Sequence, residues 1–305
     1  MKIYDLKTMQ LCEIEDNTVV ALGTFDGCHL GHMSVIRSAY LKAKEQKLKS
    51  VVYTFNEIPK SRLNSEVKSI LTLDEKIKFI RKSGIDYIAI DSFDDVKNLE
   101  GDEFISEILK STLKAKCVSC GYNYRFGKNA KYTSEDLRQF FKNDGECVDI
   151  CGKVSVNNED VSSTLIRNKI QNGEIEDILA YSKPYSIYAQ VIEGKKLGRT
   201  IGVPTINQII PGEKIVPQNG VYITECEIGE DVYPAITNVG LRPTVESTDK
   251  VNMETYIIGY SGNLYYSYIR VNFYKKIRDE IKFSSIDQLK DQIHKDIEAS
   301  KAYFR

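Results

Sequence analysis

The first half of the chain alternates short, wholly apolar runs with longer segments whose apolar residues recur every three or four positions. Such runs are typical of buried strands, and the wider spacing is typical of helices with one buried face. The expected strands cover residues 19–22, 50–55, 87–90 and 116–119, with helices between them. This βαβαβα order predicts an α/β, Rossmann-like domain with a parallel sheet covered on both faces.

The pattern changes at about residue 185 to short segments in which apolar and polar residues alternate. Turn signals such as Asn219-Gly220 and Gly262-Asn263 separate these segments. Alternation with frequent turns predicts antiparallel strands that close into a small β-barrel. From Ser284 onward apolar residues return to helical spacing, which predicts a terminal helix packed against the barrel.

Length and composition are those of a globular protein with two domains. The 305 residues suffice for two cores, and the regular pattern breaks near residue 182, so we expect domains over 1–182 and 183–305. The net charge of −1 gives no global field for nucleic acid or an anionic membrane. No signal peptide or membrane-spanning run is present. These features predict a cytoplasmic protein whose partners are neither nucleic acid nor a membrane. We expect a monomer or weak homo-oligomer.

The cysteines predict a reducing environment rather than a disulfide framework, because there are seven, an odd number for a chain of this size. Cys117 and Cys120 form a single C-x-x-C, with no second pair at the spacing of a zinc ribbon. We interpret them as a buried pair at a strand end, with a metal or redox site as the alternative.

A glycine-rich turn at residues 23–32 joins the first expected strand to the first helix. A helix that starts after such a turn presents backbone N–H groups to an anion, and His29 and His32 would lie on one face beside it. An ordinary strand-to-helix turn with structural histidines is the alternative. We favour a nucleotide-phosphate site, whose other members are Gly23, Phe25, Asp26, Gly27 and Gly31.

Two further loops of the first half carry polar residues suited to a nucleotide. Ligands of parallel sheets bind beyond the carboxyl ends of the strands. The loop at 121–127 places Asn123 and Arg125 among aromatic residues, and it either binds a planar ring or packs on the core. Hydroxyls at 162–164 with Arg167 one turn later form either an N-cap or a polyphosphate site, and we favour the latter for Ser162, Ser163, Thr164 and Arg167.

The second half has one chemically dense stretch, at residues 194–207. Glycines and basic residues there form either a phosphate-wrapping loop or a basic hairpin loop, and the spacing is not that of a Walker A motif. In an extended chain Thr205 and Asn207 point to one side and offer two oxygen ligands to Mg²⁺. Glu254 lies in an otherwise apolar and aromatic strand, as either a solvating edge charge or a general base.

Together these motifs resemble those of the bacterial bifunctional riboflavin kinase/FAD synthetase family over nearly the whole chain. The resemblance lies in the order of Thr54-Phe55 and of five longer motifs. These are GTFDGCHLGH at 23–32, GYNYRFG at 121–127, SSTLIR at 162–167, GRTIGVPTIN at 198–207 and METYII at 253–258.

The resemblance implies an amino-terminal FMN adenylyltransferase domain and a carboxyl-terminal riboflavin kinase domain. Riboflavin and ATP would give FMN, and FMN with a second ATP would give FAD and pyrophosphate. In the kinase, Glu254 would act as the base, Thr205 and Asn207 would hold Mg²⁺ with ATP, and Arg278 would lie near the flavin. The loop over the phosphates would consist of Gly194, Lys195, Gly198, Arg199, Gly202 and Pro204.

In the adenylyltransferase the resemblance implies direct attack of the FMN phosphate on the α-phosphorus of ATP. His29 and His32 would stabilise charge on the phosphates, Asn123 would lie beside the nucleotide, and Arg125 would contact the flavin. The hydroxyls of 162–164 and Arg167 would bind the leaving pyrophosphate. Such transfers rely on positioning and electrostatics more than on a covalent nucleophile.

Three places depart from the family pattern. A Pro-His-Pro element is replaced by Glu57-Ile58-Pro59, a glycine by Lys131 or Tyr132, and the domain junction reads Tyr181-Ser182-Lys183-Pro184-Tyr185. Two alternatives to a bifunctional enzyme therefore stand. One is a riboflavin kinase with a degenerate adenylyltransferase domain, and the other is a flavin- or nucleotide-binding regulator without turnover.

Overall fold

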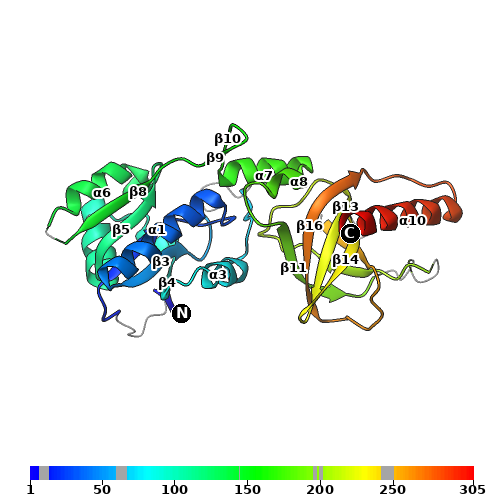
Figure 1. Cartoon of the computed structure of the whole chain (residues 1–305), viewed down its shortest axis with the longest axis horizontal. Helices are drawn as coiled ribbons and strands as arrows, with labels where there is room; N and C mark the ends of the chain where they lie inside the picture. The colour runs from blue at the N-terminus through cyan, green and yellow to red at the C-terminus, as the bar shows by residue number, and fades with distance from the viewer. Residues whose placement is uncertain (7–13, 60–66, 144, 195–197, 199–201, 242–250) are drawn as a thin grey trace. The chain divides into compact units, whose positions relative to one another are not determined.

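The computed structural model describes all residues except 7–13, 60–66, 144, 195–197, 199–201 and 242–250. The chain forms two compact units, Met1–Ser163 and Thr164–Arg305, coloured blue to green and green to red in Figure 1. The boundary expected after residue 182 falls beyond helices α7 (Ser163–Asn172) and α8 (Ile175–Ile178), which connect the sheet to the barrel. That boundary stays a prediction.

The first unit is built on a six-stranded sheet in which all neighbouring strands are parallel. The expected α/β architecture is confirmed, and two edge strands, β1 and β8, were not expected from the pattern. The strand order is β1 (Lys2–Asp5), β4 (Tyr87–Asp91), β3 (Lys49–Phe55), β2 (Thr18–Leu22), β5 (Ala115–Gly121) and β8 (Cys147–Cys151).

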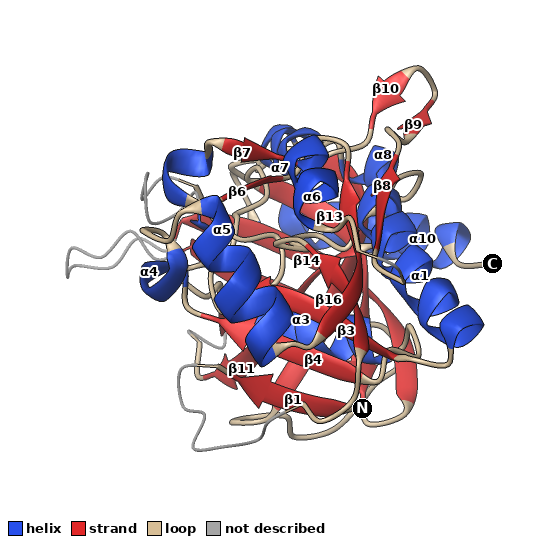
Figure 2. Cartoon of the chain, turned by 90° about the vertical axis from the view of Figure 1, so that its left-hand side faces the viewer, coloured by secondary structure: helices blue, strands red, loops and turns tan. Residues whose placement is uncertain are grey.

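Helices cover both faces of this sheet, and each face has its own apolar core (Figure 2). Val19 and Ala21 of β2 pack with α1 and α3 on one face, whereas Val20 and Leu22 pack with η1 and α6 on the other. Burial on both faces explains why β2 reads as a continuous apolar run. The helices are α1 (Leu30–Gln46), α3 (Leu73–Arg81), α4 (Phe93–Val96), α5 (Gly101–Glu103), the π-helical η1 (Phe104–Thr112), the 3₁₀ turn η2 (Lys128–Ala130) and α6 (Ser134–Phe140).

Helix α3 begins with a capping box. The Thr72 hydroxyl accepts the N–H of Glu75, and the Glu75 carboxylate accepts the N–H of Thr72. This reciprocal pair satisfies two N–H groups that the helix itself leaves unpaired. Short two-stranded ribbons complete the unit: β6 (Arg125–Phe126) with β7 (Tyr132–Thr133), and β9 (Ser155–Val156) with β10 (Glu159–Asp160).

The second unit is a closed antiparallel barrel with a terminal helix, as the alternating pattern predicts. The short strand β12 was expected only as an extended segment. Helix α10 (Ile286–Tyr303) begins at the N-cap Ser285 and packs on the barrel, where the Ser300 hydroxyl donates to the carbonyl of Ala235. The barrel order is β11 (Tyr185–Ile192), β12 (Ile206–Ile209), β15 (Val251–Ile257), β14 (Asp231–Leu241), β13 (Gly220–Ile228) and β16 (Tyr268–Arg278).

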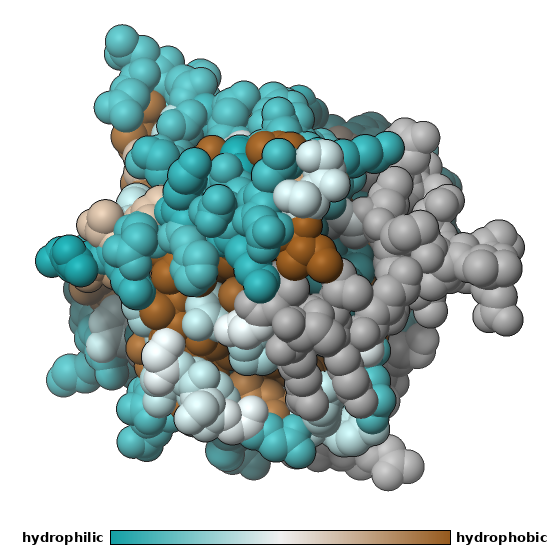
Figure 3. Space-filling view, turned by 90° about the vertical axis from the view of Figure 1, so that its right-hand side faces the viewer, coloured by the Kyte–Doolittle hydropathy of each residue, from teal (hydrophilic) through white to brown (hydrophobic). Residues whose placement is uncertain are grey.

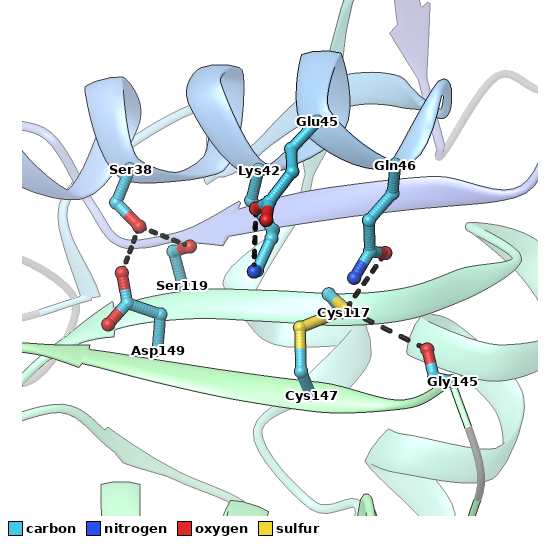
Figure 4. Close-up of polar contacts among 9 residues, drawn as sticks. All are labelled: Ser38, Lys42, Glu45, Gln46, Cys117, Ser119, Gly145, Cys147 and Asp149. Carbon is cyan, nitrogen blue, oxygen red and sulfur yellow. Dashed lines mark hydrogen bonds and ion pairs between the residues drawn. A yellow bond between two sulfur atoms is a disulfide. The ribbon is translucent and has the colours of Figure 1, made fainter.

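One disulfide corrects the expectation drawn from the cysteines. Cys117 of β5 is bonded to Cys147, its partner in register on β8 (Figure 4), and not grouped with Cys120. Beside it, the Ser38 hydroxyl of α1 contacts both the Ser119 hydroxyl and the Asp149 carboxylate. The edge strand β8 is therefore attached to the sheet by a covalent bond as well as by its hydrogen bonds.

The face in Figure 3 is mostly hydrophilic, with apolar side chains grouped towards its middle. Within the described ranges, no helix combines the length and the apolar character needed to cross a membrane.

Candidate active sites

The turn between β2 and α1 has a backbone that glycines make possible. A Cβ on Gly23 would lie 2.9 Å from the ring of Phe25, and one on Gly27, at φ +88°, would lie 3.0 Å from Ile70. Phe25 and Cys28 also have positive φ angles, of 50° and 40°. A chain bent this sharply needs residues without a side chain at its tightest points.

The two histidines of the turn stack on each other, as their spacing predicts. Their ring centroids are 3.7 Å apart with an interplanar angle of 20°. His29 is the N-cap of α1, and its Nδ1 accepts the N–H of His32 at 3.3 Å. A neutral imidazole that accepts at Nδ1 carries its proton on Nε2. His29 therefore has an N–H donor suited to a phosphate oxygen. A Cβ on Gly31 would lie 3.2 Å from the His29 ring, so glycine keeps this space open.

Asp26 has a structural function in the turn that the sequence did not reveal. Its carboxylate is 3% exposed and accepts the N–H groups of Ile70 and Leu71, at 3.0 and 3.1 Å from Oδ1. Its carbonyl accepts the hydroxyl of Ser163 at 2.7 Å. The residue predicted for phosphate binding thus joins the turn to the segment before α3 and to the start of α7.

Two of the remaining candidates in the first unit (the sheet unit) follow the carboxyl end of β5, a strand next to β2. Asn123 and Arg125 are exposed and come after β5, which pairs in parallel with β2. Because parallel neighbours end at one edge, this loop and the histidine turn share that edge. Ser162 and Ser163 lie at the start of α7. Thr164 and Arg167 are on α7 within the second unit, and their approach to a nucleotide stays a prediction.

The barrel brings together the candidates for the kinase. Asn207 of β12 is the direct cross-strand partner of Glu254 on β15. Asn207 is 6% exposed, whereas Glu254 is exposed. The loop glycines lie against the proposed metal ligands: a Cβ on Gly194 would be 2.3 Å from Nδ2 of Asn207, and one on Gly198 would be 3.4 Å from Oγ1 of Thr205. The approach of Gly194 to Asn207 therefore requires glycine, whereas Gly198 is required because a Cβ there would clash with the carbonyl oxygen of Val203.

Asn252 belongs to the same group and was not expected. It lies two residues before Glu254 on the same side of β15, and its Nδ2 donates to Oδ1 of Asn207 at 3.2 Å. The same Nδ2 is 3.5 Å from Oε1 of Glu254. Its own Oδ1 is buried without a hydrogen-bond partner in the described structure. The period-two position relative to Glu254 was the only signal for it in the sequence.

The last predicted residues of the second unit are Arg278 and the remaining members of the phosphate loop. The guanidinium of Arg278 forms a bidentate pair with Asp296 of α10, in which Nε donates to Oδ1 at 3.2 Å and Nη2 donates to Oδ2 at 2.8 Å. Arg278 thus attaches β16 to the terminal helix, and its contact with a flavin stays a prediction. Gly202 and Pro204 are exposed, and Lys195 and Arg199 lie outside the described residues.

Comparisons with known proteins agree on both halves. The family described as FAD synthetase matches residues 12–165, and the family described as riboflavin kinase matches residues 181–304. A bifunctional riboflavin kinase/FMN adenylyltransferase of Haemophilus influenzae is 34% identical, with 93% of this chain and 94% of that protein aligned. Its counterpart from Bacillus subtilis is 33% identical, with 96% of this chain and 94% of that protein aligned.

A solved structure shares the fold over nearly the full length. It is described as a macrolide-efflux protein from Streptococcus pneumoniae, and it matches with a TM-score of 0.87 and 31% identity over 99% of this chain and 98% of its own. This likeness supports the fold of each unit.

Proposed function

Because the chain belongs to the bifunctional riboflavin kinase/FMN adenylyltransferase family, we propose that the barrel unit and the sheet unit carry out its two reactions at the sites described above. Riboflavin and ATP give FMN and ADP, and FMN and ATP give FAD and pyrophosphate. The observation that carries the assignment is the cross-strand pair of Asn207 and Glu254 beneath the loop glycines. A carboxylate beside short oxygen ligands and a glycine loop is suited to phosphoryl transfer.

In the proposed kinase mechanism, Glu254 accepts the proton of the ribityl 5′-hydroxyl as that oxygen attacks the γ-phosphorus. Thr205 and Asn207 would hold Mg²⁺ through their side-chain oxygens. The fit is supported by the donor set, since hydroxyl and amide oxygens suit this ion. It is also supported by Asn252, which contacts Asn207 and whose Oδ1 is buried without a hydrogen-bond partner in the described structure. When bound, the ion neutralises phosphate charge. The loop containing Gly194 and Gly198 would close over the phosphates of ATP.

In the proposed adenylyltransferase mechanism, a phosphate oxygen of FMN attacks the α-phosphorus of ATP, and pyrophosphate leaves. The Nε2–H of His29 would donate to the phosphates, and His32 would support it from the stacked position. Asn123 would contact the nucleotide and Arg125 the flavin. The start of α7, with Ser162, Ser163, Thr164 and Arg167, would bind pyrophosphate. No covalent intermediate is needed, because the donors act on charge that develops in the transition state.

The proposal extends to the setting of the enzyme. We infer a cytoplasmic protein that is active as a monomer or weak homo-oligomer, with flavins and ATP as its partners and without nucleic acid or membrane. The replacement of the Pro-His-Pro element at 57–59 bears on flavin affinity in the sheet unit, and we propose that both activities are retained.

One assay separates this function from its alternatives. The purified chain is incubated with riboflavin, ATP and Mg²⁺, and the flavins are resolved by chromatography. Appearance of FMN followed by FAD is expected. Accumulation of FMN alone would identify a kinase with a degenerate sheet unit, and absence of any product would identify a binding protein without turnover.

A further inference from the structure

A buried lysine lies at the carboxyl edge of the sheet, in a position that neither proposed reaction uses. Lys76 is on α3 and is 5% exposed. Its Nζ donates to the carbonyl of Phe55 at 2.7 Å, to the carbonyl of Thr24 at 3.1 Å and to Oγ1 of Thr54 at 3.2 Å. Lysine is rarely buried unless its ammonium group is paired. Here three N–H groups meet three oxygens.

The three oxygens belong to two segments, the turn at residues 23–32 and the end of β3. Thr24 is the second residue of the turn, and Phe55 is the last residue of β3. The Thr54 hydroxyl also donates to the carbonyl of Thr24 at 3.0 Å. Lys76 therefore connects the turn, the end of β3 and α3 at one point. The same turn contacts the segment before α3 through Asp26, so its position depends on this corner of the unit.

The charged form of Lys76 matches these acceptors and the neutral amine does not. An ammonium group has three donors, whereas an amine has two and a lone pair that would face an oxygen. Burial lowers the pKa of Lys76 to about 8, although the nearby Asp26 and Cys28 of the turn act in the opposite direction. The ammonium form thus prevails below that pH and is lost above it.

We propose that Lys76 is a positioning residue for adenylyl transfer, whose ammonium group holds the histidine turn on the end of β3. The inference rests on the adenylyltransferase function proposed above. Deprotonation or removal of the ammonium leaves a buried carbonyl without a donor. The turn then shifts, and with it the donors aimed at the phosphates of ATP. Displacements of about 1 Å in such a site reduce rates by about 100-fold.

The first test compares a substitution of Lys76 with one of Lys82, the residue that follows α3. Lys76→Met is expected to lower kcat/KM for FAD formation from supplied FMN by about 100-fold. Lys82→Met, at an exposed position just after the same helix, is the matched control and should retain the wild-type rate. Riboflavin phosphorylation by the same samples reports on the folded barrel, and circular dichroism reports on the secondary structure of the whole chain. A folded Lys76→Met protein that forms FAD at the wild-type rate would overturn the inference.

The second test is a pH profile, which does not depend on the stability of the methionine variant. In the wild type, kcat/KM for FAD formation should fall about tenfold for each pH unit above 8, the slope of a single titrating group. In Lys76→Arg the decline should disappear, because a guanidinium stays charged. A wild-type profile without the decline, or an unchanged decline in Lys76→Arg, would contradict the inference. Wild-type protein that forms no FAD at any pH would instead contradict the proposed function.

Discussion

Glu254 lies between two asparagines of neighbouring strands, Asn207 on β12 and Asn238 on β14. Both neighbours are neutral amides, and the carboxylate is exposed. Buried Asn252 donates to Asn207 from the residue two positions before Glu254. The carboxylate is therefore accessible to a substrate hydroxyl.

Glu254→Gln tests the proposed base. The substitution preserves size and removes the proton acceptor, so FMN formation from riboflavin should fall by about 100-fold or more. FAD formation from supplied FMN should continue at the wild-type rate, because that reaction is assigned to the other unit. Glu230→Gln, in the exposed turn before β14, serves as the control. Loss of both activities together would argue against this division of work.

Asn252→Asp tests the support of the kinase site. Aspartate has the same shape but lacks the Nδ2 donor that Oδ1 of Asn207 accepts at 3.2 Å. Substitutions of residues that orient metal ligands typically cost 10- to 100-fold. We expect about a tenfold loss in kcat/KM for riboflavin and a changed Mg²⁺ dependence. The matched control is Asn263→Asp in an exposed turn, where the side-chain oxygen accepts the N–H of Tyr265. Equal kinetics in the two variants would remove Asn252 from the site.

The contacts by which Lys76 and Asp26 support the candidate site could not be predicted from the sequence. Lys76 and Asp26 are bound to partners more than 20 residues away, and a period of two or 3.6 carries no information on such pairs. The stacked histidines were predictable, because their contact depends only on three-residue spacing at a helix start.

At the scale of elements, the apolar pattern predicted the central strands well and the edges poorly. Strand β2 is buried on both faces and reads as a continuous apolar run. The edge strand β8 has a half-exposed pattern and contains Asp149, so its sequence resembles a loop. The Cys117–Cys147 pair could not be predicted either, because it requires β5 and β8 to be neighbours in register.

The disulfide should stabilise the sheet unit only in the oxidised protein. It closes a segment with a sequence separation of 30, which is worth about 3.6 kcal/mol by chain entropy. Cys147→Ser should lower the free energy of unfolding of oxidised protein by about this amount. In a reducing cytoplasm Cys117 and Cys147 would remain free thiols. The wild type and Cys147→Ser would then have the same free energy of unfolding. Cys151→Ser on the same strand, a free cysteine, is the control for urea unfolding with and without reductant. A stability that reductant leaves unchanged would argue against the bond.

At the scale of the whole molecule, the chain consists of two compact units, Met1–Ser163 and Thr164–Arg305. The change of pattern near residue 185 predicted two architectures. It did not predict that α7 and α8 pack with the barrel, since their helical pattern continues that of the first half. The carbonyl of Ile170 accepts the N–H of Gln218 at 3.3 Å, and Glu176 pairs with Lys275 of β16 at 3.0 Å.

This packing decides where a fragment must begin if it is to contain a stable barrel. A fragment of residues 164–305 keeps α7 and α8, whereas a fragment of 183–305 loses Ile170, Ile175 and Ile178, which are at most 1% exposed. Each buried isoleucine contributes about 1.5–3 kcal/mol, so the shorter fragment should unfold at a clearly lower urea concentration. We expect the longer fragment to form FMN and no FAD. Equal stability and equal kinase activity of the two fragments would instead support a boundary after residue 182.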